Sequence, residues 1–149
     1  MNSKELFVRD TTVTKQSDNL FTAEVSENWS IGNTANGGYS MTLAAKAMSE
    51  FLEHKDPLSI SAHYLDRVDF GSTELHVTHL SSSKSLSTAR VEFIQDNKIK
   101  IIFIGTFTDF SFKNDLNIYE RDVPNFPEYN SCEVIPYKEG FNPKLDKNI

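Results

Sequence analysis

The sequence contains little cysteine and little glycine: its 149 residues include one cysteine and six glycines. The single cysteine, Cys132, excludes an internal disulfide, and we interpret it as an ordinary thiol because no histidine or carboxylate motif surrounds it. Long apolar runs are also missing, since the longest, residues 101–104, is far short of the roughly 18 residues of a membrane-spanning helix. Residues 1–5 lack the apolar core of a signal peptide. These absences predict a cytoplasmic protein that does not insert into a membrane.

Positive charge is scarce as well. The chain has 15 lysines and arginines against 21 aspartates and glutamates, for a net charge of -6. General nucleic-acid binding is therefore not expected, because an acidic chain is repelled by phosphates, although a local basic patch could still hold a phosphorylated ligand. The content of 38% hydrophobic and 24% charged residues is that of an ordinary globular domain.

One long helix is predicted over residues 39–52. Its apolar residues follow the three-four-seven spacing of a helix with one buried face, as in Met41, Ala44, Met48 and Phe51. Alanines on that face allow the helix to lie close to a sheet. The helix should end before Pro57, because proline disfavours helical geometry in the residue that precedes it.

Strand-like segments lie on both sides of this helix. They cover residues 6–15 and 20–26 before it, joined by a polar turn at 16–19, and residues 59–68, 73–80, 85–95 and 98–110 after it. Asp96-Asn97 predicts a two-residue hairpin, because both residue types tolerate positive φ. The last segment is apolar on both faces, which indicates an interior strand, and the short connections indicate an antiparallel sheet.

The predicted fold class is therefore α+β, with an antiparallel sheet of five or six strands wrapped around one long helix. This is the hot-dog layout, which usually occurs in pairs, so we expect a homodimer or higher homo-oligomer. Residues 1–112 are assigned to this domain. Residues 113–149 are polar, contain four prolines and show no period, which predicts an irregular tail or linker.

Four blocks of sequence resemble the thioesterase-like superfamily in order and spacing over residues 25–110. They are Trp29-Ser30-Ile31-Gly32 with Asn36-Gly37-Gly38-Tyr39, then residues 56–65 (DPLSISAHYL), residues 84–91 (KSLSTARV) and residues 93–97 (FIQDN). The chain is most similar to the N-terminal hot-dog domain of type II acyl-CoA thioesterases, which carry two hot-dogs in one chain. The resemblance implies an acyl-CoA substrate and no cofactor. Either two copies dimerise to recreate the pair, or the sequence is a fragment.

The helix entry at Asn36-Gly37-Gly38 is the first candidate site. Unpaired N–H groups at a helix N-terminus can polarise a thioester carbonyl, and glycines let the substrate approach the backbone. The resemblance favours this role for Gly37 and Gly38, with Tyr39 beside them in substrate binding, over a turn that simply needs glycine. Asn36 either caps the helix through its side-chain oxygen or meets the substrate.

Three further candidates follow the helix. Gln95 corresponds to a glutamine that orients the water or the carbonyl in the second hot-dog of the two-domain family, or it is an exposed residue before a turn. Ser59 lies where that second domain uses a hydroxyl, or it is a solvent-facing strand residue. His63 is the histidine best placed to face the helix, as a substrate contact or a structural residue. No metal site is expected, because residues three apart on a strand, as His76 and His79 are, point to opposite faces.

A catalytic acid is missing where the resemblance implies one. Related single-domain enzymes carry an aspartate seven residues after the second glycine, and here that position is Ala45. Glu50 lies on the polar side of the helix, and Asp66 and Asp69 resemble strand-end surface residues. The leading hypothesis is therefore an acyl-CoA thioesterase, and the alternative is a catalytically degenerate hot-dog that binds acyl-CoA or serves as a structural half. Hydratase chemistry would need a His/Asp pair near the helix start, and none is visible.

Overall fold

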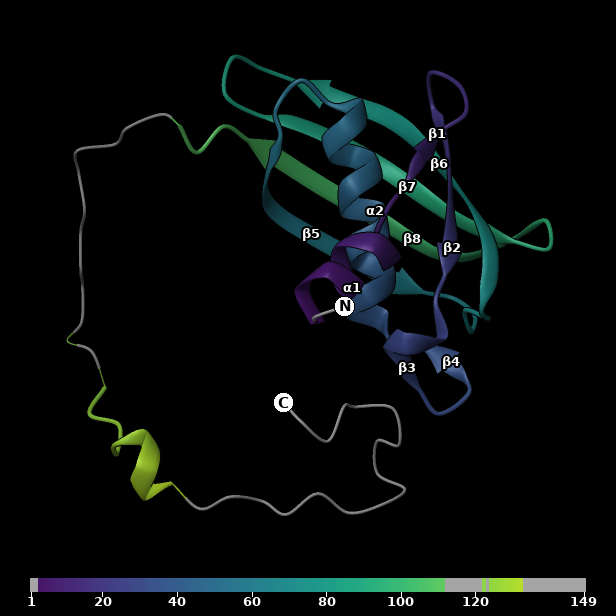
Figure 1. Ribbon diagram of the computed structural model, residues 1–149. Coiled ribbons are helices and arrows are strands. Elements are labelled where there is room, and N and C mark those ends of the chain that lie inside the picture. Colours follow the sequence, from purple (N-terminus) through teal and green to yellow (C-terminus); the bar gives the residue numbers. More distant parts are fainter. Residues whose placement is uncertain (1–2, 112–121, 123, 133–149) are drawn as a thin grey trace.

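A computed structural model describes residues 3–111, 122 and 124–132 of the chain (Figure 1). One six-stranded antiparallel sheet, in the order β1-β2-β6-β7-β8-β5, curves around the helix α2 (Gly37–Phe51). The strands are β1 (Thr14–Lys15), β2 (Leu20–Val25), β5 (Asp56–Tyr64), β6 (Gly71–Ser82), β7 (Ser87–Gln95) and β8 (Lys98–Thr108). The predicted α+β architecture is confirmed, and β8 is an interior strand as its pattern indicated.

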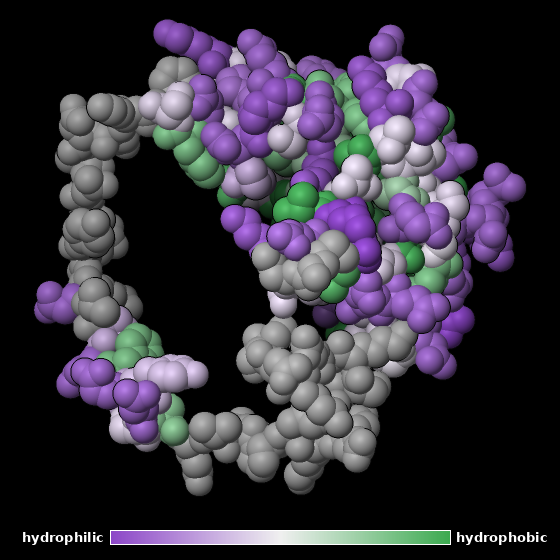
Figure 2. All heavy atoms as spheres, viewed as in Figure 1, coloured by the Kyte–Doolittle hydropathy of each residue, from purple (hydrophilic) through white to green (hydrophobic). Residues whose placement is uncertain are grey.

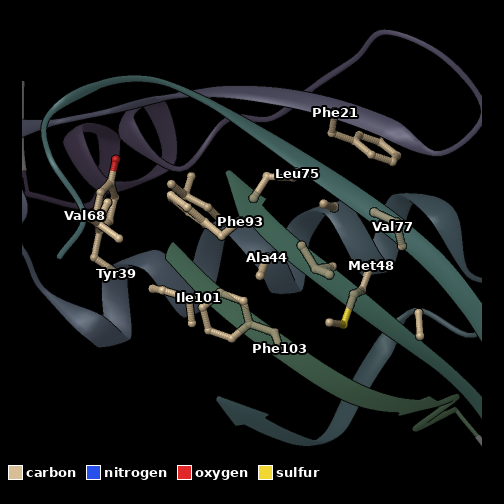
Figure 3. Packing of buried hydrophobic residues seen from close by; sticks show 14 of the residues in the cluster. Phe21, Tyr39, Ala44, Met48, Val68, Leu75, Val77, Phe93, Ile101 and Phe103 are labelled. Atoms are coloured by element: carbon tan, nitrogen blue, oxygen red, sulfur yellow. The ribbon is translucent and has the colours of Figure 1, made fainter. Parts of the chain in front are cut away.

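The core lies between α2 and the concave face of the sheet (Figure 3). Alternate residues of each strand face inward, and paired strands bring Leu75 opposite Phe93 and Val91 opposite Phe103. Ala44 and Met48 of α2 are fully buried against them. At about 25 cal/mol per Å² of buried apolar surface, such an interface is the main source of stability.

Gly105 of β8 is a place where the sheet has no room for a side chain next to α2. It lies in register with Ala89 on one side and Ile60 on the other. A Cβ atom at this position would lie 2.5 Å from Met48 Sδ and 3.0 Å from the Phe107 ring. The small residues on both elements therefore let the helix lie close to the sheet, as the alanines predicted.

The hairpin between β7 and β8 has the predicted two-residue turn. Asp96 and Asn97 adopt φ values of 51° and 58°. Both residues in the left-handed region give the twist that joins antiparallel strands through two residues.

Two segments before α2 differ from the prediction. The expected strand over residues 6–15 is wrong: residues Ser3–Asp10 form the helix α1, and only β1 pairs with β2. A glutamate in the first turn of α1 and an arginine in the last favour the helix electrostatically. The stretch expected to be irregular contains the 3-10 helix η1 (Glu27–Trp29) and a small hairpin of β3 (Ser30–Ile31) and β4 (Thr34–Ala35).

Most of the expected tail, residues 113–149, lies outside the described residues, so its irregular character stays a prediction. Residues 124–132 are described, and they contain the 3-10 helix η2 (Tyr129–Ser131). Among all described residues, no helix is long and apolar enough to cross a membrane.

Candidate active site

The first turn of α2 is fixed by Asn36, which is the N-cap of the helix. Its side-chain oxygen accepts hydrogen bonds from the Gly38 N–H at 2.8 Å and the Tyr39 N–H at 3.4 Å. Its own N–H donates to the Trp29 carbonyl at 2.8 Å. The capping alternative for Asn36 is therefore the one that the geometry supports, and this oxygen already serves two helix amides.

This cap decides which amide is available to a ligand. The Ser40 N–H donates to the Asn36 carbonyl at 3.0 Å, so it is engaged like those of Gly38 and Tyr39. The Gly37 N–H makes no hydrogen bond within the part of the chain that the structure describes. Gly37 therefore supplies a donor at the positive end of the helix dipole.

Tyr64, at the end of β5, lies against Gly37. A Cβ atom on Gly37 would be 2.8 Å from the Tyr64 hydroxyl oxygen and 3.0 Å from its ring. A side chain at Gly37 would therefore displace the Tyr64 ring, and at Gly38 a Cβ atom would lie 3.2 Å from the Asn36 side-chain oxygen. Both glycines fit a tightly built turn, whether or not a thioester also approaches it.

The Tyr64 hydroxyl is the second donor at this position. The residue is 54% exposed, and its hydroxyl makes no hydrogen bond to any described residue. The ring is held edge-on against Phe103, with centroids 6.4 Å apart. The sequence reasoning missed Tyr64, although its alternation with Ile60 and Ala62 places it on the inward side of β5.

An ion pair follows Tyr64 along the chain. The buried Lys100 donates from Nζ to the Asp66 carboxylate at 3.0 Å, and the Lys100 carbonyl accepts from both the Leu65 and Asp66 N–H groups. The hydrogen bond from Lys100, then the backbone N–H of Arg67, lowers the pKa of Asp66. Asp66 is therefore an ionised carboxylate at the end of the sheet that carries Tyr64, and a weak base.

Tyr39 is buried and takes part in a structural cluster. Its hydroxyl donates to the Asp10 carbonyl at 2.7 Å and accepts from the Ser26 N–H at 3.1 Å. Burial, together with the nearby charge of Asp10 and Glu24, raises the pKa of Tyr39. We refer to Asp10 with Ser26, Asn28, Trp29 and Tyr39 as the Asp10 cluster.

Gln95 is buried, so the interpretation as an exposed residue before a turn is wrong. Its Oε1 accepts from the Asp69 N–H at 3.0 Å, and its Nε2 donates to the carbonyls of Asp69 at 2.9 Å and Ser72 at 3.4 Å. These bonds hold the loop after Val68, whose carbonyl accepts from the Ala35 N–H next to Asn36. Gln95 thus supports the start of α2 indirectly, through the loop after Val68. A direct role for Gln95 in catalysis stays a prediction.

Ser59 and His63 are not brought to the helix start. Both are exposed residues of β5, in register with Thr106 and Ile102 on the outer face of the sheet, whereas Ile60 and Ala62 face the core. The expectation that His63 faces the helix is wrong because side chains alternate along a strand, and the neighbouring Ala62 takes the inward position. His63 therefore points outward.

The described residues contain no group of three or more histidine, cysteine, aspartate or glutamate side chains that could hold a metal ion. The arrangement instead provides two hydrogen-bond donors, the Gly37 N–H and the Tyr64 O–H, at the partly exposed first turn of α2. Two donors aimed at one oxygen stabilise the negative charge that develops when a carbonyl is attacked.

Comparison with known proteins gives the geometry a context. Residues 25–109, more than half of the chain, match the family model described as acyl-CoA thioesterase N-terminal domain. No curated protein matched the sequence.

Solved structures share the fold. A putative thioesterase II from Thermobifida fusca YX is 20% identical with a TM-score of 0.79, over 93% of this chain and 52% of that one. The tesB protein of Mycobacterium avium subs paratuberculosis is 20% identical with a TM-score of 0.73, over 87% and 50% of the two chains. A protein of unknown function with a hot dog fold from Alicyclobacillus acidocaldarius is 14% identical with a TM-score of 0.75, over 89% and 50%. The chain spans about half the length of these structures.

Proposed function

Because the chain belongs to the acyl-CoA thioesterase N-terminal domain family, we propose that it hydrolyses the thioester of an acyl-CoA at the start of α2. The observation that carries this proposal is the unengaged Gly37 N–H beside the unengaged Tyr64 hydroxyl, among the residues that the structure describes. In the proposed reaction the thioester carbonyl oxygen accepts from both donors. Water adds to the acyl carbon, the carbon–sulfur bond breaks, and the products are a carboxylic acid and the free thiol of CoA.

Within one chain, the described residues near the start of α2 supply only a weak general base. Ala45 occupies the position where the resemblance implies an acid, and Asp66 is held ionised by Lys100. A base of lowered pKa accelerates proton removal from water poorly. The proposed enzyme is therefore slow as a single domain, or it takes its base from a second hot-dog.

A second hot-dog has an edge at which to pair. Within the described sheet, strand β5 has β8 as its one partner. It ends at Tyr64, which is 54% exposed, and the next residue, Leu65, is 59% exposed. Edge strands expose backbone groups that can pair with another strand. We propose a homodimer formed at this edge, which would bring the second copy next to Tyr64.

The second candidate function is a degenerate domain that binds acyl-CoA or serves as a structural half. Ala45 in place of an acid and the match to only half of each double-length structure favour it. The two functions are separated by assaying purified protein against acyl-CoAs of several chain lengths for released thiol. Release above the uncatalysed rate supports the thioesterase, and binding without release supports the degenerate domain.

A further inference from the structure

The backbone donor proposed for the start of α2 lies on a pair of glycines, Gly37 and Gly38. Glycine adopts many backbone conformations, so neither residue by itself fixes the direction of its own N–H. A donor stabilises a developing oxyanion best when it is held in place before the reaction. The position of the Gly37 N–H must therefore be set by the residues on either side of the glycines.

Both of these sides are tied to Asp10, the last residue of α1. Before the glycines, the Asn36 N–H donates to the Trp29 carbonyl at 2.8 Å, and the Trp29 indole N–H donates to the Asp10 carboxylate at 3.1 Å. After them, the Tyr39 hydroxyl donates to the Asp10 carbonyl at 2.7 Å. The rings of Trp29 and Tyr39 also stack, with centroids 6.2 Å apart. Residues 36–39 are thus held at both ends through one aspartate.

The carboxylate of Asp10 is the centre of this arrangement. Asp10 is the one buried residue of α1, which passes in front of α2 in Figure 1, on a face where Figure 2 shows hydrophobic residues among the hydrophilic ones. One oxygen of Asp10 accepts from Trp29 and also from Asn28 Nδ2 at 2.8 Å and Ser26 Oγ at 3.0 Å. The other oxygen pairs with Arg9. Burial by itself raises the pKa of Asp10, but these hydrogen bonds outweigh it and lower the pKa, so the carboxylate is ionised at neutral pH.

We propose that Asp10 is a positioning residue for the oxyanion site: its carboxylate orients Trp29 and, through Trp29, the cap that leaves the Gly37 N–H free. The proposal rests on the proposed function for the reaction that this N–H serves, and on the contacts for the geometry. Loss of the carboxylate should release residues 36–39 and leave the core closed, because its hydrogen bonds go to residues 9 and 26–29, outside the six-stranded sheet.

Asp10→Asn tests the geometry without turnover. Asparagine keeps the shape of the side chain but points an N–H₂ group either at Arg9 or at the other donors, so the contacts weaken. We expect amide hydrogen exchange at Asn36 and Tyr39 to become about 10-fold faster, while the amides of β7 and β8 keep their wild-type rates. The indole N–H resonance, which is unambiguous because Trp29 is the only tryptophan, should shift.

Asn28→Ala is a milder variant for the same measurement, because it removes one donor and keeps the carboxylate. It should accelerate exchange at Asn36 about 3-fold. Asp18→Asn, which removes an exposed carboxylate from the β1–β2 turn, is the matched control and should leave exchange at residues 36–39 unchanged. Wild-type exchange at residues 36–39 in both Asp10→Asn and Asn28→Ala would overturn the proposal, and so would equal acceleration in β7 and β8.

Kinetics connect this position to the reaction. A displaced donor weakens binding of the transition state more than binding of the substrate, so Asp10→Asn should lower kcat for acyl-CoA hydrolysis about 10-fold with KM unchanged. Unchanged kcat in a variant with faster exchange at Asn36 would overturn the role of Asp10 in the reaction. A wild-type chain that hydrolyses no acyl-CoA contradicts the proposed function instead, and hydrogen exchange still decides whether Asp10 positions the start of α2.

Discussion

At the start of α2, most backbone amides are hydrogen-bonded within the protein, and one is available to a ligand. The Asn36 side chain accepts from the amides of Gly38 and Tyr39, and its carbonyl accepts from that of Ser40. Of the amides of residues 37–40, only that of Gly37 has no hydrogen-bond acceptor among the described residues. Tyr64 occupies the space in front of the Gly37 α-carbon and adds a hydroxyl. The proposed oxyanion site is therefore made of one backbone and one side-chain donor.

Removal of the Tyr64 hydroxyl tests the side-chain donor. Tyr64→Phe keeps the ring contact with Phe103 and removes only the O–H group. We expect kcat for acyl-CoA hydrolysis to fall about 10-fold with little change in KM, less than the roughly 100-fold cost of losing a water-excluded donor. Tyr129→Phe, at a described residue that is 89% exposed and far along the chain, is the control. Equal kcat for Tyr64→Phe and the control would remove Tyr64 from the site.

Gln95 is expected to affect stability first. Gln95→Ala leaves the buried Asp69 backbone groups without their partner, at a cost of about 2 kcal/mol, and should lower Tm by roughly 5–10 °C. The measurement is thermal unfolding followed by circular dichroism. Gln16→Ala, which loses one exposed hydrogen bond to Thr22, should change Tm little. A Gln95 variant as stable as this control would contradict the supporting role.

The sequence predicted the local part of this site. Capping was one of two roles predicted for Asn36. A cap is predictable from sequence because its partners lie only two and three residues further along the chain. Gln95 and Tyr64 could not be assigned, since their partners Asp69 and Gly37 come from other elements whose register only the fold determines.

Among the elements, α2 and β8 meet at Gly105, which has no side chain to separate the strand from Met48. Gly105→Ala would place a methyl group against Met48 and Phe107, and overpacking of this kind costs about 1–3 kcal/mol. Chemical denaturation should show this loss in the free energy of unfolding. In the double variant Gly105→Ala, Met48→Ala the two losses should be less than additive, because Met48 no longer meets the added methyl group. Strict additivity would show that the close approach is relieved elsewhere.

The elements were predictable where the pattern is periodic. The buried face of α2 and the alternation in β7 and β8 have the periods of a helix and a strand, and the structure contains both. The helix α1 was missed because its attachment depends on Asp10, a polar residue whose partners lie 16 to 19 residues away. No hydrophobic period marks a helix that buries one residue.

The whole molecule combines a net negative charge with an edge strand, β5, in the sheet that the described residues form, and the proposed site lies beside that edge. Pairing through β5 would cover Tyr64 and Leu65, and an antiparallel pair of edge strands is the natural contact between two copies. We expect sedimentation to give twice the mass of the chain. Ala62→Pro on this edge should yield monomers that remain folded, because the Leu65 N–H donates to the Lys100 carbonyl, so the alternate N–H groups of β5, including that of Ala62, point away from β8, and proline there removes a donor from the open edge alone. A wild-type chain that stays monomeric at all accessible concentrations would contradict the paired arrangement.

The proposed chemistry of the domain is hydrolysis at the start of α2. Its most direct test is the rate at which purified protein releases free CoA from octanoyl-CoA, followed by a thiol reagent after the response of Cys132 has reached its plateau. We expect a saturable rate that is proportional to protein concentration and falls with Tyr64→Phe. Release no faster than in buffer, at protein concentrations that bind the substrate, would contradict the thioesterase and leave the domain as a binder of acyl-CoA.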